Sequence, residues 1–450
     1  MPDAARQRAF ALEIVEKLRA AGFEALWAGG CVRDELLGLV PKDYDVATSA
    51  TPDDIRAIFG RRRTLAVGAA FGVITVLGPR AAGQIEVATF RTDAAYSDGR
   101  HPDAVIFTTA EHDAQRRDFT INGLFFDPVA QKIVDYVGGQ EDIERRIVRA
   151  IGDARQRLRE DRLRMLRAVR FAATFQFEIE PQTFAVIQEM APDITSVSPE
   201  RIGMEIRRML LDPNRARAIQ LLRDSRLLPH VLPEIADLSQ TRFEETLRIL
   251  SALREPTLSL ALAALLSWEQ RVGSTQRGVG SAERRERSTQ YSVQSTEYGV
   301  HGTESDVLLR APCSQLPALV GRRLRYTNKE IERAAWLLQQ LPAILHALQQ
   351  AWPSLQRILT HEGATELLAL HEAMAGSDDP ALAFCRERLA WPPERLNPPP
   401  LLDGAALIAH GLAPGPQFAQ LLEQVRDAQL EGRIQTRDEA LALVDRLRSM

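Results

Sequence analysis

Cysteine is scarce in this chain, and its scarcity excludes two kinds of scaffold. The 450 residues include three cysteines, Cys31, Cys313 and Cys385. They are odd in number and far apart in the sequence, a pattern that predicts neither a disulfide framework nor a zinc site. We interpret Cys31 as a small buried residue.

Long apolar runs are also missing. No apolar stretch approaches the roughly 20 residues that a membrane-spanning helix needs, and residues 1–8 lack the apolar centre of a signal peptide. We therefore expect a soluble, cytoplasmic protein. Because 45% of the 450 residues are hydrophobic, the chain can bury substantial cores, and its length predicts two to four domains.

The chain has no excess of positive charge. Its formal net charge of −4 gives no global indication of nucleic-acid binding, although a local basic surface stays possible. Lysine is rare, so the basic residues are nearly all arginine. Arginine suits bidentate contacts to phosphate, but a GC-rich genome produces the same bias, and we draw no function from it.

A double glycine between a predicted strand and a predicted helix indicates a phosphate-binding turn. Residues 24–28 predict a short buried strand, and Gly29 and Gly30 then allow the backbone to approach a ligand closely. Residues 31–37 predict a helix whose N-terminal N–H groups and dipole favour an anion. Arg33 adds a full positive charge to this turn.

Two carboxylates follow this turn. Asp43 and Asp45 are two residues apart, so on a strand both point to the same face. Such a pair can hold two magnesium ions that grip a triphosphate and activate a hydroxyl. An isolated Asp-x-Asp more often marks a solvated turn. Following the glycine turn, we interpret it as the catalytic centre of a nucleotide site.

Glu86 lies in a predicted apolar strand, residues 84–89. A carboxylate in such a strand needs a partner or a metal. One hypothesis places Glu86 beside Asp43 and Asp45 as a third catalytic acid. The alternative is a structural ion pair with Arg91.

Residues 116–122 predict part of the nucleotide pocket. Arg117 would contact the triphosphate, while Asp118 and Asn122 would contact the ribose or orient Arg117. The alternative is that Asp118 caps a helix that starts at residue 119. We interpret the preceding pair, residues 112–113, as a surface feature.

Four charged residues recur every three positions: Asp161, Arg164, Arg167 and Arg170. On a helix predicted over 158–175 they form a slowly turning stripe about 13 Å long. Asp161 offers acceptors and Arg164 donors, which together suit the base edges of C and A. Arg167 and Arg170 would lie towards the phosphates. The alternative is a solvated arginine face with an i,i+3 ion pair.

These blocks, in this order, resemble the class II tRNA nucleotidyltransferases and bacterial poly(A) polymerases. The resemblance covers residues 10–235 strongly and resumes at 312–340 and 400–445. It implies template-independent addition or repair of the 3′-terminal CCA of tRNA from CTP and ATP, with Mg2+ as the cofactor. A bacterial poly(A) polymerase and a tRNA nucleotidyltransferase that adds only A remain alternatives.

The patterns predict an α+β fold. A nucleotidyltransferase head with a small mixed sheet would span 1–150, including strands at 64–77 and 133–136. A helical neck over 151–230, a body over 231–395 and a tail over 396–450 would follow, with the body and tail holding the tRNA elbow. Polar residues 270–311 predict a disordered insertion. Residues 91–114 predict a mobile loop, and the resemblance links this loop to the switch from C to A addition.

The body raises one other class of function. Residues 262–266 resemble the run that precedes the His-Asp pair of HD-type phosphohydrolases, but Ser267 and Trp268 follow and cannot replace those metal ligands. This argues against a phosphohydrolase. The intact Asp43 and Asp45 pair argues against a non-catalytic RNA-binding protein.

Overall fold

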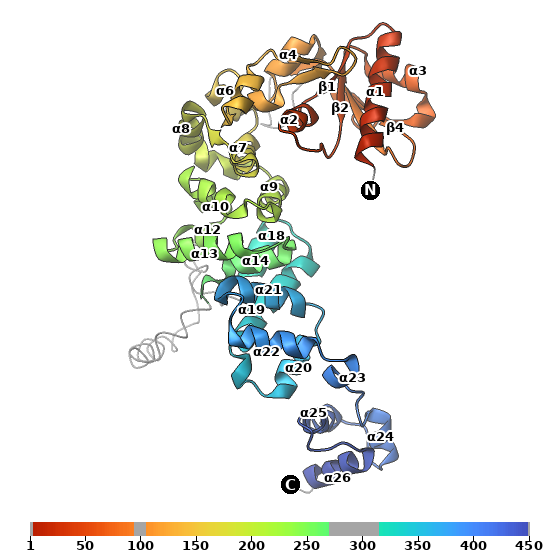
Figure 1. The fold of residues 1–450 in the computed structure, drawn as a ribbon, viewed down its shortest axis with the longest axis vertical. Coiled ribbons are helices and arrows are strands. Elements are labelled where there is room, and N and C mark those ends of the chain that lie inside the picture. The colour runs from red at the N-terminus through yellow and green to blue at the C-terminus, as the bar shows by residue number, and fades with distance from the viewer. Residues whose placement is uncertain (1–2, 94–104, 270–314, 449–450) are drawn as a thin grey trace, which may run out of the picture. The chain divides into compact units, whose positions relative to one another are not determined.

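The chain divides into two compact units, Met1–Ala236 and Asp237–Met450, and Figure 1 gives the order of their elements. The structure is a computed structural model that describes residues 3–93, 105–269 and 315–448. The predicted insertion at 270–311 and residues 94–104 of the predicted loop at 91–114 lie outside these residues. A mixed sheet in the first unit and helices in the second confirm the α+β prediction.

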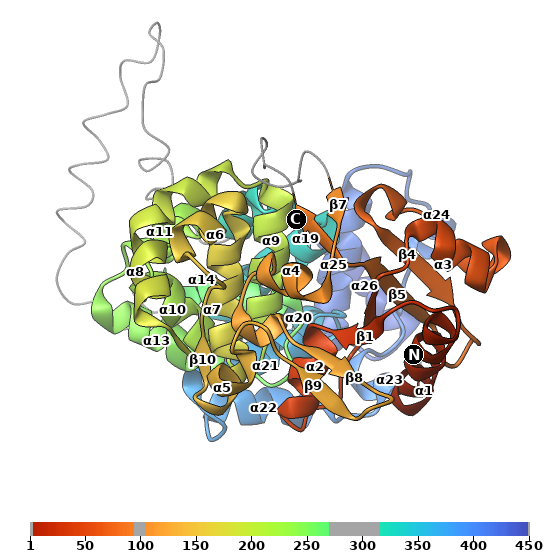
Figure 2. The ribbon, with the colours of Figure 1, turned by 90° about the horizontal axis from the view of Figure 1, so that it is seen from above.

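A seven-stranded sheet forms the centre of the first unit, with strand order β3-β4-β5-β2-β1-β8-β9. Figure 2 labels strands β1, β4, β5, β8 and β9 of this sheet. The pair β2–β5 is parallel, and the other neighbouring strands are antiparallel. The strands are β1 Ala25–Ala28, β2 Asp45–Thr48, β3 Thr64–Leu65, β4 Val73–Leu77, β5 Gln84–Thr89, β8 Phe125–Asp127 and β9 Lys132–Val134.

The prediction of one strand over residues 64–77 is wrong. A 3-10 turn, η2 Ala69–Phe71, interrupts it, and Gly72 then adopts a left-handed conformation with φ +78°. Because glycine has no Cβ, it adopts this conformation without strain and lets β4 turn back along β3. The interruption produces two antiparallel strands.

The prediction of a loop over residues 91–114 is also wrong where the structure describes it. Strands β6 Arg91–Asp93 and β7 Val105–Phe107 pair antiparallel, and helix α4 Ala110–Gln115 follows them. Alternating polar and apolar residues are few here, so neither strand was predictable from a period of two.

Helices cover both faces of the large sheet. Helix α1 Ala4–Ala20 contacts β1, β2 and β5 through its buried apolar side, which includes Phe10 and Ile14. On the other face, Ala110 and Ala114 of α4 pack against Leu26 and Ala47 of the sheet. The site described below lies on the α4 face. The other helices of this region are α2 Gly30–Leu36, α3 Pro52–Phe59, η1 Arg61–Arg63, η3 Thr120–Asn122 and α5 Gly139–Glu144.

The rest of the first unit is mostly helical. The predicted helix over 158–175 is two helices, α6 Ala154–Glu160 and α7 Leu163–Phe175, because Asp161 between them is extended at φ −147° and ψ 105°. Two short strands, β10 Ile147–Val148 and β11 Glu178–Ile179, pair in parallel. The remaining elements are α8 Pro181–Met190, η4 Ala191–Ser196, α9 Pro199–Leu211, α10 Arg215–Asp224, α11 Leu228–Val231 and α12 Pro233–Ala236.

Helices build the described part of the second unit. Every residue of α14 Leu258–Leu266 is buried, so this helix forms the centre of the packing. A separate apolar cluster, with Leu407, Val425 and Val444 at its centre, joins the last three helices. The remaining elements are α13 Gln240–Ala252, η5 Ser267–Glu269, α18 Leu316–Arg323, α19 Asn328–Leu345, η7 Ala347–Gln349, α20 Trp352–Leu359, α21 Ala364–Ala375, α22 Pro380–Leu389, α23 Pro393–Leu396, α24 Gly404–Ala409, α25 Gln417–Leu430 and α26 Arg437–Arg448. None of the described helices has the length and apolarity needed to cross a bilayer.

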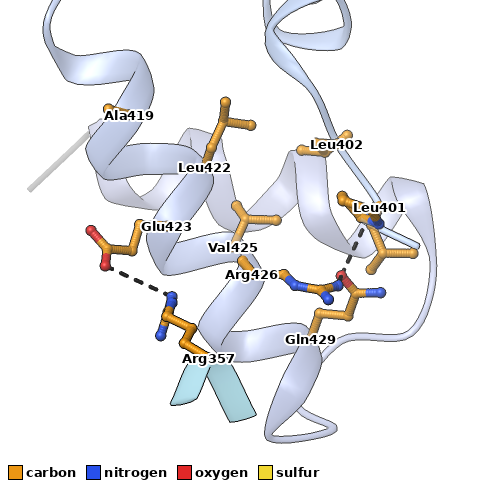
Figure 3. A pocket seen from close by; sticks show the side chains of 10 residues that line it. Arg357, Leu401, Leu402, Ala419, Leu422, Glu423, Val425, Arg426 and Gln429 are labelled. Atoms are coloured by element: carbon orange, nitrogen blue, oxygen red, sulfur yellow. Dashed lines mark hydrogen bonds and ion pairs between the residues drawn. The ribbon is translucent and has the colours of Figure 1, made fainter. Parts of the chain in front are cut away.

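A hollow of about 490 Å³ opens between α20 and α25 (Figure 3). Two arginines border it. Arg357 pairs with Asp427 at 2.5 Å and with Glu423 at 3.7 Å. Arg426 donates hydrogen bonds to the carbonyl oxygen of Pro398 and to neighbouring amide oxygens. Since both guanidinium groups are already engaged, we assign no ligand to this hollow.

Candidate nucleotide-binding and catalytic site

Three carboxylates lie near one another at the start of β2. Asp45 is the first residue of β2, and Asp43 lies two residues before it. Asp45 is paired in register with Glu86 of β5, so their side chains point to the same face of the sheet. Arg91, the alternative partner of Glu86, instead donates a hydrogen bond to the carbonyl oxygen of Phe71. The hypothesis that groups Glu86 with Asp43 and Asp45 fits this arrangement.

The residue between the two aspartates faces the opposite way. Tyr44 is buried, its ring packs edge-on against Trp27 at 4.9 Å, and its hydroxyl donates to Glu35 Oε1 at 2.8 Å. Glu35 also pairs with Arg8 of α1. These contacts fix Tyr44 on the α1 face, and alternation turns the next residue, Asp45, to the α4 face. Asp43 precedes the strand and lies close enough for its charge to act on Asp45.

Asp45 has a strongly perturbed acidity. The protein around its carboxyl removes hydration, and the nearby Asp43 and Glu86 carboxylates repel its charge. Together these effects raise the pKa of Asp45 to about 7, although Arg117 lowers it in part. A group of acids whose charges repel one another is a place where a bound cation gains free energy.

The acidic group offers two metal ligands rather than three. Throughout residues 3–93, 105–269 and 315–448, no three His, Cys, Asp or Glu side chains converge closely enough to hold a metal ion. Asp43 and Asp45 supply hard carboxylate oxygens at an open surface. That donor set fits an ion that takes one or two carboxylates and completes its shell with water and substrate phosphates.

The glycine turn places backbone beside Arg117. Gly29 has φ +71° and ψ −121°, a conformation essentially restricted to glycine, and its N–H donates to the carbonyl oxygen of Leu124. A Cβ at Gly29 would lie 2.7 Å from Arg117 Nη1. The first glycine therefore leaves the space that Arg117 occupies, while Gly30 begins α2.

The Arg33 guanidinium is largely engaged in contacts within the protein. Its side chain is 9% exposed and donates to Asp34 Oδ1 and to Asn122 Oδ1. Its guanidinium also lies 4.4 Å from the centre of the Phe175 ring. Arg33 thus links α2 to η3 and α7, and its charge is partly balanced by Asp34.

Arg117 is held by a residue that the sequence analysis set aside. Asp113 Oδ2 accepts hydrogen bonds from Arg117 Nε and Nη2 at 3.2 and 3.0 Å, and its Oδ1 accepts two from Arg116. The interpretation of Asp113 as a surface residue is wrong, because its side chain is 2% exposed. Burial opposes its ionisation, but Arg117 and Arg116 outweigh burial and lower the pKa of Asp113. The adjacent His112 is exposed.

Asp118 and Asn122 connect the two arginine-rich segments. Asp118 Oδ1 accepts from Asn122 Nδ2 at 3.0 Å, and Oδ2 accepts from Arg167 Nε at 2.8 Å. Burial would raise the pKa of Asp118, but the Arg167 charge and the Asn122 hydrogen bond lower it to about 2. Asp118 caps no helix, since η3 begins at Thr120 without a side-chain cap. It is instead the ionised centre of a chain from Arg33 to Arg167.

Asp161 and Arg164 lie side by side but not on one helix. Asp161 is extended before α7, and its Oδ1 accepts the N–H of Leu163 at 3.1 Å. Its Oδ2 accepts from Arg201 of α9 at 2.6 Å. Arg164 is nearly buried and donates to Glu160 Oε2 at 2.7 Å. The predicted stripe therefore begins at Arg164, and Asp161 is held beside it by other contacts.

The end of the stripe surrounds an aromatic ring. Arg170 lies 4.0 Å and Arg167 5.3 Å from the centre of Phe171. Arg170 also donates to the buried Glu205 at 2.5 Å. Three residues of this arrangement were not predicted as site residues: Asp113, which was interpreted as a surface residue, Arg201 and Glu205. Each sits in a polar or helical context typical of solvated residues.

Comparisons with known proteins match the two halves of this arrangement. Residues 25–149, which carry the glycine turn, the acids and Arg117, match the model of the poly A polymerase head domain. Residues 176–238 match a model described as a probable RNA- and SrmB-binding site of polymerase A. The chain thus contains a poly A polymerase head domain followed by its associated RNA-binding region. A nucleotidyltransferase head of this kind implies use of a divalent metal ion.

Individual CCA-adding enzymes are similar to the chain over about half of its length. The CCA-adding enzyme of Geobacillus stearothermophilus is 42% identical over 250 residues, which are 55% of this chain and 59% of that protein. The CCA-adding enzyme of Enterococcus faecalis is 44% identical over 206 residues, 46% of this chain and 50% of that protein. The alignments thus span little more than half of these relatives.

A solved structure extends the similarity to the whole chain. The crystal structure of the Bacillus stearothermophilus CCA-adding enzyme in complex with CTP superposes with a TM-score of 0.74 at 29% identity. That superposition covers 98% of this chain and 97% of the other.

Proposed function

We propose that this protein is a template-independent nucleotidyltransferase that adds or repairs the 3′-terminal CCA of tRNA, using CTP and ATP. The observation that carries the proposal is the acidic group at the start of β2, where Asp45 has a pKa of about 7 beside Asp43 and Glu86. Arg117 lies next to this group and supplies a positive charge for a triphosphate. The similarity to CCA-adding enzymes supports the choice of substrates.

Asp43 and Asp45 would hold magnesium. Two carboxylates at an open surface suit Mg2+, which keeps several waters and accepts phosphate oxygens as further ligands. When bound, Mg2+ would lower the pKa of the primer 3′-hydroxyl and neutralise charge on the leaving pyrophosphate. Glu86, one strand away, would add negative charge and strengthen binding of the cation.

The arginines and the glycine turn would orient the nucleotide. Arg117, fixed by Asp113, presents its remaining N–H groups beside Gly29 and the acidic group. Arg167 is 31% exposed and is held by Asp118, so it remains available to a phosphate. Arg33 and Asn122 would position these groups, and Gly30 would leave room for the phosphates.

Asp161 and Arg164 would choose the base. Asp161 is an acceptor and Arg164 a donor, and they differ by three residues across the start of α7. C and A each present an amino group next to a ring nitrogen, which such a pair can bind, whereas U and G present carbonyl oxygens in place of the amino group. Arg170 would lie further from the base.

The chain would work as a head (1–150), a neck (151–230), a body (231–395) and a tail (396–450). The boundary between the compact units at residues 236–237 and the matched ranges 25–149 and 176–238 support the first divisions. The body and tail would hold the tRNA through its backbone and shape. An enzyme with this substrate would act in the cytoplasm.

A primer-extension assay tests the proposal. The full chain would be incubated with Mg2+, a tRNA that lacks CCA, and each of the four nucleoside triphosphates in turn. CTP alone should extend the primer by two residues, and ATP should extend a tRNA that ends in CC by one. Extension with ATP only would support an A-adding enzyme, and long A tails on any RNA would support a poly(A) polymerase.

A further inference from the structure

Arg201 contacts the proposed base-selecting pair from a distant part of the sequence. It lies in the first turn of α9, forty residues after Asp161, and donates from Nη2 to Asp161 Oδ2 at 2.6 Å. Both side chains are largely enclosed, with 21% of Arg201 and 17% of Asp161 exposed. Its position is therefore set by the packing of α9 on α7, which are in contact.

The two oxygens of Asp161 are fixed from different sides. Oδ1 accepts the N–H of Leu163, a local contact that any aspartate before a helix makes. Oδ2 accepts a hydrogen bond from Arg201, which approaches from α9. Without Arg201, the carboxyl group could rotate about its bond to the Cβ. Its second acceptor oxygen, Oδ2, would then no longer be held in one orientation.

The neighbouring donor is fixed by a different set of contacts. Arg164 donates to Glu160 and to the carbonyl oxygen of Arg157, both on α6. Removal of Arg201 would therefore disturb the acceptor of the pair and leave the donor in place. A base that needs both groups would lose its advantage over a base that needs only a donor.

We propose, resting on the function proposed above, that Arg201 is a positioning residue that sets nucleotide specificity by orienting Asp161. Arg201 does not contact the base. It holds the Asp161 carboxylate in one orientation, so that Asp161 accepts a hydrogen bond from the amino group of C or A. A nucleobase without that amino group gains nothing from the oriented acceptor.

The test replaces Arg201 and measures selection among nucleotides. Arg201→Gln should lower kcat/KM for CTP and ATP by about tenfold, since hydrogen bonds to charged groups carry this much discrimination. The same variant should use UTP and GTP at a higher rate relative to CTP. Arg201→Lys should restore most of the selectivity, because Arg201 uses a single donor and lysine keeps the charge.

A matched variant separates positioning from folding. Arg155 lies on α6, the helix that ends beside Asp161, and forms an exposed ion pair with Glu189 of α8. Arg155→Gln removes this ion pair and should leave selectivity unchanged. If Arg201→Gln lowers the rate with all four nucleotides equally, or if Arg201→Lys selects no better than Arg201→Gln, the inference is wrong. Should the wild-type chain extend no RNA at all, the proposed function fails, a result distinct from unchanged selectivity in an active enzyme.

Discussion

Asp45 titrates near neutrality because of what surrounds it. Its pKa lies at about 7 rather than the ordinary 3.8, so the folded chain binds this proton more tightly than the unfolded chain. Protonation of Asp45 therefore stabilises the folded state fully below about pH 4, and this contribution to the free energy of unfolding is lost as the pH rises through about 7.

This sign gives a prediction for metal-free protein. At pH 8 the wild type carries a repelled charge at Asp45 that Asp45→Asn lacks, so the variant should melt at a higher temperature than the wild type. At pH 4 the two should melt together. Calorimetry with a chelator at both pH values measures the difference, and a variant less stable than wild type at pH 8 would contradict the environment described for Asp45.

The same substitution should nearly abolish catalysis. Removing one of two metal-binding carboxylates should lower kcat by at least about 100-fold, because a bound metal ion supplies several kcal/mol of charge stabilisation. Asp53→Asn, a change of the same type at an exposed position on α3, should keep full activity. Near-normal turnover of Asp45→Asn with Mg2+ would exclude Asp45 as a ligand.

Asp113 holds two arginines and should be important for both stability and binding. Asp113→Ala leaves Arg116 and Arg117 without their shared acceptor, and breaking such a buried pair costs about 3 kcal/mol. Urea denaturation should show this loss, and the KM for the nucleotide should rise because Arg117 is no longer fixed. A variant with unchanged KM would show that Arg117 does not depend on Asp113.

Single residues were predictable where the backbone pattern is regular. The place of Glu86 in β5, beside Asp45 of β2, followed from its apolar strand, whereas a shared strand face for Asp43 and Asp45 stays a prediction because β2 begins at Asp45. Asp113 could not be found in this way, because a charged residue in a polar segment has the same pattern whether it is buried or solvated. Its role depends on two arginines whose positions only the folded chain defines.

At the scale of elements, the turn between β1 and α2 is the most constrained part of the site. Gly29 combines a positive φ with a close approach of Arg117. Gly38, at the other end of α2, has a similar φ of +70° but nothing within 4 Å of the place of a Cβ. A side chain at either position would strain the backbone, but only a side chain at Gly29 would also displace Arg117.

Gly29→Ala and Gly38→Ala test this separation. Both should destabilise the protein by about 1–3 kcal/mol, the usual cost of such backbone strain. Only Gly29→Ala should also raise the KM for CTP, by roughly tenfold if one charged contact is lost. Equal KM values in the two variants would mean that Arg117 moves aside without consequence.

Element boundaries were less predictable than element types. Residues 181–190 and 199–211 were predicted as helices and are helices within those bounds. The break between α6 and α7 was not predicted, because Asp161 and Arg162 are neither glycine nor proline. The side chain of Asp161 is held by Arg201, forty residues away, and local sequence carries no information about such a contact.

At the scale of the whole molecule, all residues of the candidate site belong to the first compact unit. The change from a mixed sheet to helices was predictable from the loss of period-two patterns after residue 150. The domain limits of 1–150, 151–230, 231–395 and 396–450 remain predictions, because residue patterns alone do not show which helices share a core.

A fragment of residues 1–236 tests this division. It should bind CTP with an affinity close to that of the full chain, since no candidate site residue lies beyond residue 236. It should bind tRNA far more weakly, because the proposed contacts of the body and tail are missing. Equilibrium dialysis and circular dichroism would measure binding and folding; a folded fragment that binds no CTP would contradict the location of the site.

The measurement that tests the account most directly is sequencing of product ends. The full chain would receive CTP, ATP, Mg2+ and a tRNA without its terminal CCA, with Asp45→Asn as the inactive control. The account predicts that most products gain three residues, C, C and A, and then stop. Long runs of A, or no addition by a folded wild-type chain, would contradict it.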